Sequence, residues 1–518
     1  MKEPTMKDPL LEDNYEGGKR QGRRKSTLPR VPFRMASDIA KQFSSLSQYM
    51  STTAHNLLYT VYVLWFVLCV PTTIFHFYIG EDGASEDVYS IIWGWLTISY
   101  TWQFIEGAIT MKNHFVNFCL HRPSSDTGNV EYPTATAIIV AYLPNEADII
   151  MDTLAQFRAM HYEGELQVIL AYNTPKVLPV EQDIQALQKI WPEFTAHKVV
   201  GSTSKCDNIN AVLTSIRGTF VGLFDSDHIP LPHSFERAWR DLQSGSDVVQ
   251  GRTKINPKYC QTTLDKVIAA EFEVRHGIEH GSRKFVYNYA VFGGSNGFWR
   301  TDVLQFIGMD PGMLTEDIDS SIRAMSYGYK ISYNHHLISL EQPPPGFNAL
   351  LKQRLRWSQG WYQVSWRSVS SIFLTDFLNL RQKIGFHWML KMMMPAQITV
   401  LHLQSFLLVC LTAKYGALAV LCLSSVWVVP QLIFLIFFAE LPAAWKGLYA
   451  VMILPLMAFF IFIDMIAQVR LMIGYSTWHV TTRKKVDKEE GERAVPISPS
   501  TFRYSPSTVM LDRSGLDV

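Results

Sequence analysis

The sequence lacks three features that usually narrow the class of a protein: net charge, closely spaced cysteines and internal repeats. Lysine and arginine (47) nearly balance aspartate and glutamate (46), which leaves a net charge of +1. This balance gives no reason to expect a nucleic acid or another polyanionic partner. The six cysteines include no C-x-x-C pair. We therefore expect reduced structural thiols, and neither a disulfide framework nor a cysteine zinc site.

The N-terminal residues 1–50 lack the apolar content that a folded core needs. They are polar, rich in serine and carry a basic cluster at 19–25. We expect a disordered basic tail. The first apolar run begins only near residue 56, so no secretory leader is expected at this end.

Five long apolar runs are present, two before and three after a more polar central stretch. They lie at 56–79, 88–111, 388–413, 415–438 and 446–470. Each has roughly the length that crosses a bilayer core. The runs predict two transmembrane helices over 56–111 and about three more over 388–470. Core helices of a soluble protein are the alternative, but ordinary core helices are shorter.

Basic residues predict the orientation of the chain in the bilayer. The positive-inside rule places the cluster at 19–25 in the cytosol, and two spans return the chain to the same side. The domain at 130–365 is therefore expected in the cytosol, in a multi-pass membrane protein. Asp464 and Gln468 lie four apart in the last run. Polar side chains there indicate either a functional path or a helix–helix contact.

The C-terminal end conflicts with a simple count of spans. Three C-terminal spans would leave the tail outside, yet the basic residues 483–485 favour the cytosol. A break at Pro430 or Pro455, or a re-entrant run, would resolve the conflict. We expect a cytosolic, mostly disordered tail over 471–518. The stretch 366–386 is predicted to be an amphipathic helix at the membrane interface.

The sequence of the central stretch, 130–365, is typical of a water-soluble α/β domain. Short apolar runs alternate with helical stretches, at 136–142, 166–172, 197–200, 219–225 and 247–251. Continuous apolar strands separated by helices predict a parallel sheet covered on both faces.

Asp225-Ser226-Asp227 follows one of these apolar strands directly. Open α/β sheets bind their ligands at the carboxyl ends of the strands. Two carboxylates at i and i+2 can converge on one hard cation, and Mg²⁺ or Mn²⁺ binds through a few carboxylates plus substrate phosphates. A surface turn is the alternative, but the position after a buried strand favours a metal site.

Two further clusters lie downstream. Thr315-Glu316-Asp317 opens a predicted helix, where acidic residues are often only favourable first-turn charges. A carboxylate is also a common general base, so this cluster is a candidate for that role. Residues 353–357 read QRLRW. They fit a solvated amphipathic helix, but arginine also suits bidentate phosphate recognition and tryptophan suits stacking on a ring.

In this order, D-x-D, T-E-D and Q-x-x-R-W resemble the inverting family-2 glycosyltransferases, and more narrowly the processive cellulose, chitin and hyaluronan synthases. Residues 141–146 resemble the first-strand nucleotide loop, 205–210 the K-x-x-N-x-N stretch and 294–300 the acceptor-side loop. Residues 476–483 resemble a loosened S-W-x-T-R motif. The fungal hyphal-growth and capsule-type group looks most similar. The resemblance covers 132–365 and implies a GT-A fold, a Rossmann-like α/β domain inserted between transmembrane helices.

The resemblance also implies a role for each matching residue. Asp225 and Asp227 would hold the donor diphosphate through Mg²⁺ or Mn²⁺. Asp317 would be the general base, within the motif that includes Thr315 and Glu316. The other donor-binding residues would be Pro144, Glu146, Asn173, Lys205, Gln353 and Arg356, with Asp225 among them, and the acceptor-binding residues would be Ser295 and Trp357.

One residue departs from the family pattern. The family usually carries an aspartate at the end of its second strand, where it contacts uracil, and this sequence has Asn173 there. An asparagine can still hydrogen-bond a base edge. A UDP-sugar stays the expected donor, and the sugar itself stays open.

Together these features predict transfer from a UDP-sugar to a growing polysaccharide, which yields a β-linked extracellular or cell-wall glycan moved across the lipid bilayer. A non-processive transferase acting on ceramide or a polyprenyl phosphate is the alternative enzyme. A catalytically inactive membrane scaffold is the alternative outside enzymes, and the intact carboxylates speak against it. Whether the chain forms a homo-oligomer stays open.

Overall fold

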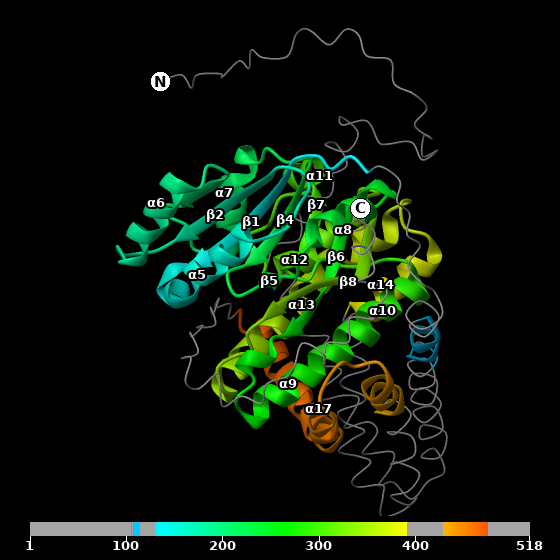
Figure 1. The fold of residues 1–518 in the computed structure, drawn as a ribbon. Coiled ribbons are helices and arrows are strands. Elements are labelled where there is room, and N and C mark those ends of the chain that lie inside the picture. Colours follow the sequence, from blue (N-terminus) through cyan, green and yellow to red (C-terminus); the bar gives the residue numbers. More distant parts are fainter. Residues whose placement is uncertain (1–104, 106, 114–129, 391–427, 475–518) are drawn as a thin grey trace, which may run out of the picture.

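A computed structural model describes residues 105, 107–113, 130–390 and 428–474 (Figure 1). The N-terminal tail, nearly all of the first two predicted spans, most of the next two and the tail beyond 474 lie outside the described residues. The predictions for those segments therefore stay predictions.

An eight-stranded sheet forms the centre of the described domain, in the order β3-β2-β1-β4-β7-β6-β8-β5. Its strands are β1 (Ala135–Tyr142), β2 (Leu166–Asn173), β3 (Phe194–Lys198), β4 (Phe220–Asp225), β5 (Ile229–Pro230), β6 (Val248–Ile255), β7 (Gly297–Arg300) and β8 (Ile331–Glu341). The first four strands are parallel, as predicted. The prediction of an all-parallel sheet is wrong for the second half, because β7 runs antiparallel to β4 and β6, and β5 antiparallel to β8.

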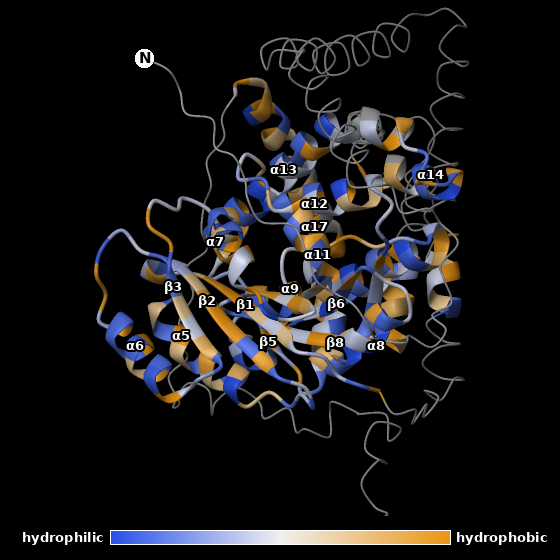
Figure 2. Ribbon diagram, turned by 90° about the horizontal axis from the view of Figure 1, so that it is seen from above, coloured by the Kyte–Doolittle hydropathy of each residue, from blue (hydrophilic) through white to orange (hydrophobic). Residues whose placement is uncertain are grey.

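Two hydrophobic cores cover the two faces of the parallel half. Successive side chains of a strand point to opposite faces. Ile138 and Val140 of β1 therefore enter one core, and Ala137 and Ile139 enter the other. Because both faces are buried, β1, β2 and β4 are mostly apolar (Figure 2), whereas the edge strand β3 is largely exposed. This explains why the sequence reads as continuous apolar runs.

Helices pack on both faces of the sheet. Those on the first core are α7 (Lys205–Val212), α11 (Thr301–Ile307) and α12 (Glu316–Ser326). Those on the second are α5 (Leu143–Arg158), α6 (Val180–Ile190) and α8 (Ser234–Gln243). The sequence resemblance predicts a loop at 141–146, but α5 begins at Leu143, directly after β1 ends at Tyr142.

Three further helices form a separate group (Figure 1): α9 (Thr263–Val274), α13 (Phe347–Leu374) and α17 (Ala443–Met472). Helix α9 contacts α17, and α17 contacts α13. The prediction of one helix over 366–386 is wrong. Helix α13 ends at Leu374, where Thr375 is extended, and α14 (Leu380–Met389) begins after Asn379, whose side chain caps it.

Among the described residues, no single helix has both the length and the apolarity of a membrane span. The two halves of α17, Ala443–Ile453 and Ala458–Met472, meet both measures when taken together, with a bend of 54° between them. Pro455 lies at the bend. A proline inside a helix removes a hydrogen bond and clashes with the preceding turn, which accounts for the bend.

Candidate functional site

The carboxyl ends of β1, β2 and β4 form the edge at which the predicted site residues gather. Asp225 is the last residue of β4 and Asn173 the last of β2. In the sheet register, Val140 pairs with Asp225 and Tyr142 with Asn173. The two strand ends therefore flank the end of β1, as the sequence predicts for an open α/β sheet.

Lys205 carries the positive charge at this edge. It begins α7, which Ser204 caps by accepting a hydrogen bond from the Asp207 backbone. Its Nζ forms an ion pair with Asp225 and donates a 2.6 Å hydrogen bond to the Gly294 carbonyl. Burial lowers the pKa of Lys205, but the carboxylates of Asp225 and Glu316 outweigh burial and hold the pKa above its usual value. Lys205 therefore stays charged.

The backbone at Gly294 lies between Lys205 and Asp317. Its φ of +88° is a conformation that favours glycine. A Cβ atom added there would lie 3.2 Å from Asp317 Oδ2 and 3.8 Å from Lys205 Nζ. The next residue, Ser295, accepts a 3.1 Å hydrogen bond at Oγ from the backbone N–H of Asp225. The loop at 294–295 thus links the D-x-D motif to the T-E-D motif. Any side chain at position 294 would crowd Asp317.

Asp317 lies in the first turn of α12, which begins after Thr315. Its Oδ1 accepts a 2.9 Å hydrogen bond from the Ile318 backbone. Burial, and then the charge of Glu316, raise the pKa of Asp317 to about 7, although Lys205 and Arg356 act in the opposite direction. A carboxyl group with this pKa exchanges a proton near neutral pH.

Glu146 adds a third carboxyl group beside Asp225 and Asp227. It is buried in the first turn of α5, where its Oε2 accepts a 2.8 Å hydrogen bond from the Tyr142 backbone. Burial, together with the charges of Asp227 and Asp225, raises the pKa of Glu146 to about 8. Oxygen ligands are the ones that Mg²⁺ and Mn²⁺ prefer, so the chemistry of Asp225 and Asp227 fits such an ion.

Helix α13 carries the Q-x-x-R-W motif and places it against the T-E-D motif. Arg356 Nη1 donates a 2.9 Å hydrogen bond to the Leu314 carbonyl, and Gln363 Oε1 accepts one of 3.0 Å from the Leu314 backbone. Gly360 faces Thr315 so closely that a Cβ atom there would lie 2.5 Å from Thr315 Cγ2. The position of the helix thus depends on a glycine at 360.

Gln353 and Trp357 occupy different surroundings on α13. Gln353 is buried, and its Oε1 has no hydrogen-bond partner within the described part of the chain. A buried acceptor of this kind is suited to a ligand. The Trp357 ring packs against the hydrophobic cluster that includes Ile268 and Phe272 of α9, and Arg354 Cζ lies 4.5 Å from the ring centroid. Its contacts are thus those of a residue that joins α13 to its neighbouring helices.

Asn173 is engaged within the protein. Its Oδ1 accepts a 2.9 Å hydrogen bond from Asn208, and its Nδ2 donates one of 3.1 Å to the Ser202 carbonyl. Pro144 lies in the first turn of α5. Both residues therefore lie at the carboxyl edge of the sheet.

His228, which the sequence interpretation missed, is buried directly after Asp227. Its Nε2 lies 2.7 Å from Glu341 Oε2 and its Nδ1 lies 3.2 Å from Ser339 Oγ. These contacts tie the chain that leaves the D-x-D motif to β8. Its place in the sequence, next to a carboxylate pair, was the available signal.

Comparison with known proteins agrees with this arrangement. Residues 133–360 match the family model described as "Glycosyltransferase like family 2". This stretch thus resembles a family 2 glycosyltransferase domain, and its eight-stranded sheet agrees with the α/β part of the predicted fold class.

Several known proteins are similar in sequence to parts of this chain. The chain is 22% identical to the probable glycosyltransferase YdaM of Bacillus subtilis over 56% of this chain and 68% of that protein. It is 31% identical to the probable glucomannan 4-beta-mannosyltransferase 3 of Arabidopsis thaliana, over 27% of this chain and 26% of that one. It is 25% identical to the poly-beta-1,6-N-acetyl-D-glucosamine synthase of Staphylococcus aureus, over 46% of this chain and 57% of that one.

Among solved structures, a mannosyltransferase of Pyrobaculum calidifontis in complex with GDP-Man and Mn²⁺ is 16% identical, with a TM-score of 0.47 over 69% of this chain and 98% of that one. Similarity at this level does not transfer the ligands of that protein to this chain. The match to the plant relative covers about a quarter of that protein's length, so its whole activity does not transfer either.

Proposed function

We propose that the chain is a membrane-embedded, inverting glycosyltransferase that extends a polysaccharide from a UDP-sugar. The observation that carries this proposal is the convergence of Lys205, Asp225, the Gly294 carbonyl and Asp317 at one buried edge of the sheet. Charges for a diphosphate and a carboxyl group with a pKa near neutrality lie together there. This is what transfer from a nucleotide-sugar to a hydroxyl requires.

In this proposal each residue has a stated task. Asp225 and Asp227 hold Mg²⁺ or Mn²⁺, which when bound neutralises charge on the leaving diphosphate. Lys205 and Arg356 place fixed positive charge near the same group, and Gln353 offers a buried polar contact. Asp317 accepts the proton of the acceptor hydroxyl, which attacks the anomeric carbon from the face opposite the diphosphate. An α-linked donor then gives a β-linked product.

Chain extension is supported by the way α13 is held. Ser358 Oγ donates a hydrogen bond to Asp464, and Gln468 Nε2 donates one of 2.7 Å to the Tyr362 hydroxyl. The helix that carries Gln353 and Arg356 is thereby bonded to α17, whose two halves together have the length and apolarity of a membrane span. The names of two relatives refer to polymers, glucomannan and poly-beta-1,6-N-acetyl-D-glucosamine. We place the domain on the cytosolic side of the plasma membrane, beside the spans through which a polymer would leave.

The test is turnover of the purified full chain with a panel of radiolabelled UDP-sugars and Mg²⁺ or Mn²⁺, followed by sizing and linkage analysis of the product. A β-linked polymer supports the proposal. A single sugar on a lipid would refute chain extension and favour the ceramide or polyprenyl phosphate alternative. Absence of transfer from every UDP-sugar, with transfer from another nucleotide-sugar, would overturn the donor.

A further inference from the structure

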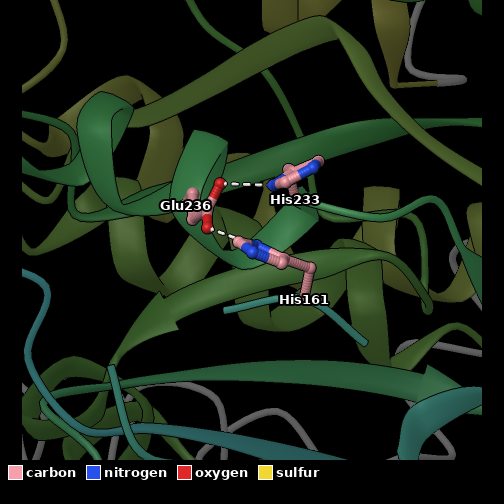
Figure 3. Close-up of side chains that lie close together, drawn as sticks. All are labelled: His161, His233 and Glu236. Carbon is pink, nitrogen blue, oxygen red and sulfur yellow. Dashed lines mark hydrogen bonds and ion pairs between the residues drawn. The ribbon is translucent and has the colours of Figure 1, made fainter. Parts of the chain in front are cut away.

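A group of side chains that could hold a metal ion lies away from the D-x-D edge. His161 follows the C-terminal end of α5, His233 precedes α8, and Glu236 lies in the first turn of α8. Figure 3 shows the two imidazole rings on the carboxylate of Glu236. Helix α5 has 16 residues and is about 24 Å long, and its first turn holds Glu146. The group therefore lies at the far end of α5 from the candidate donor site.

The ligand atoms of this group already converge. His161 Nδ1 lies 3.0 Å from Glu236 Oε1, and His233 Nδ1 lies 2.7 Å from Glu236 Oε2. All three residues offer atoms within 4.8 Å of one another. Zinc binds nitrogen and oxygen ligands at about 2.1 Å, which sets neighbouring ligand atoms of a tetrahedral site roughly 3.3 Å apart. Small side-chain shifts would therefore be enough to admit an ion.

The backbone around the group holds these side chains in place. The ring of Tyr162, next to His161, packs against Phe220 and Phe235. His233 has φ +63° and ψ 14°, a left-handed conformation that few residues other than glycine adopt. Glu236 is nearly buried, with a side chain 10% exposed, whereas the histidine side chains are 58% and 48% exposed. An ion can reach the histidines from solvent, and the carboxylate is fixed beneath them.

We propose that His161, His233 and Glu236 form a second divalent-metal site, selective for Zn²⁺ and similar ions over Mg²⁺. Two imidazoles and one carboxylate are a ligand set of zinc, and they leave a position for water. Mg²⁺ prefers oxygen ligands and does not compete well for imidazole nitrogen. The ion would join the end of α5 to the start of α8. Five residues, 228–232, separate His233 from Asp227, so the site would also fix the chain that leaves the D-x-D motif.

The test measures Zn²⁺ binding to the full chain, stripped with a chelator and kept in millimolar Mg²⁺ so that the carboxylate site is occupied. We expect His161→Ala, Glu236→Ala and His233→Asn each to bind one equivalent fewer, or at least about tenfold more weakly, than the wild type. Asparagine tolerates the left-handed backbone, so His233→Asn removes the ligand and keeps the fold. His197→Ala, which removes an exposed histidine of β3, is the matched control and should bind like the wild type.

A thermal measurement adds a readout that does not depend on activity. Zn²⁺ should raise the unfolding midpoint of the wild type and of His197→Ala, because an ion that binds only the folded state stabilises it. It should not raise the midpoint of the three ligand variants. Equal binding and equal stabilisation in wild type and variants would overturn the site. The group would then be a hydrogen-bonded contact in which both imidazoles donate to Glu236. The donor-site proposal would be unaffected, since Asp225 and Asp227 are unchanged.

Discussion

The two halves of the sheet bury different chemistry. The faces of β1 and β2 are packed almost entirely with apolar side chains. Strand β6 is equally buried, yet its buried residues include Arg252 and Lys254. Both form ion pairs with Glu273 of α9, and Lys254 also lies 2.6 Å from Glu440. The first half is held by apolar packing, and the second half adds a buried charge network.

This difference shows how the α/β domain is joined to the apolar helices. Buried ion pairs seldom add stability over apolar packing, but an unpaired buried charge is strongly destabilising. Burial raises the pKa of Glu273, but Arg252 and Lys254 outweigh it and hold the pKa below its usual value. The carboxylate is therefore charged and needs its partners. The network fixes α9 against β6 and reaches Glu440, close to the start of α17. We infer that the charge network in the second half of the sheet sets the position of α9 relative to the sheet.

The segment after α9 continues this pattern. Two π-helical turns, Arg275–Glu279 and Arg283–Tyr287, flank a short helix. The rings of His276 and His280 stack 4.7 Å apart, and burial lowers the pKa of both well below the usual value. Both are therefore neutral at physiological pH. Turns of this type often occur at functional sites, and here they lie between the sheet and the apolar helices.

The largest effect is expected from Asp317→Asn. Strand β4 and helix α7 supply Asp225 and Lys205 from the first half of the fold. Helix α12, which lies between the second-half strands β7 and β8 in the chain, supplies the proposed base, so this change should separate donor binding from chemistry. We expect the turnover rate to fall by roughly 10²–10⁴-fold, because general base catalysis is lost. Donor affinity, measured by calorimetry, should stay within a few-fold of the wild type.

Asp302→Asn is the matched control for that change. The Asp302 carboxylate also accepts a hydrogen bond from the next backbone N–H at a helix start, at 3.0 Å, but it is exposed at α11. Its turnover should match the wild type. If Asp317→Asn kept full turnover, the base assignment would be wrong. The second half of the sheet would then only fix the positions of the helices and would supply no reacting group.

The next largest effect is expected from breaking the charge network. Glu273→Gln leaves Arg252 without its carboxylate partner and should destabilise the fold by about 3–5 kcal/mol. Ile138→Val, in the apolar half, should cost only about 0.5–1.5 kcal/mol. Unfolding midpoints in the same detergent give the comparison.

A double variant sharpens this result. Replacing both partners, Arg252→Met with Glu273→Leu, should recover much of the stability, because no unpaired carboxylate or guanidinium remains and Lys254 keeps Glu440. Equal losses for Glu273→Gln and Ile138→Val would show that the two halves do not differ in the way proposed.

The same difference explains how much could be predicted from the sequence. Strands β1, β2 and β4 are predicted within one residue or so because both of their faces are buried, which leaves continuous apolar runs. Strand β7 has only four residues, and β8 has partly exposed polar residues at 334–336 together with a register shift against Gly251 and Arg252. Neither β7 nor β8 forms a continuous apolar run. The composition of a strand also does not reveal whether it pairs parallel or antiparallel to its neighbour.

The site shows the same division. Asp225, Asp227 and Asp317 could be found because each follows a strand or opens a helix in a short motif. The approach of Lys205 to Asp225 and Gly294 joins three separate segments, and only the folded chain brings them together. His161 and His233 lie 72 positions apart, without the close spacing of a metal motif. Such contacts depend on how α5 and α8 pack, which local pattern does not encode.

The smallest expected effect concerns pH. Burial and the charge of Glu316 raise the pKa of Asp317 to about 7. A base must be ionised, so wild-type turnover should fall as the pH drops below about 7. Glu316→Gln removes one of the two causes and leaves burial, so the acidic limb should move to lower pH. A shift of up to about one pH unit corresponds to an interaction of roughly 1.4 kcal/mol. Turnover against pH for both proteins, at saturating donor, checks this. If the acidic limb stayed in place or moved to higher pH, it would report the ionisation of a group other than Asp317. Asp317 would then no longer be supported as the base.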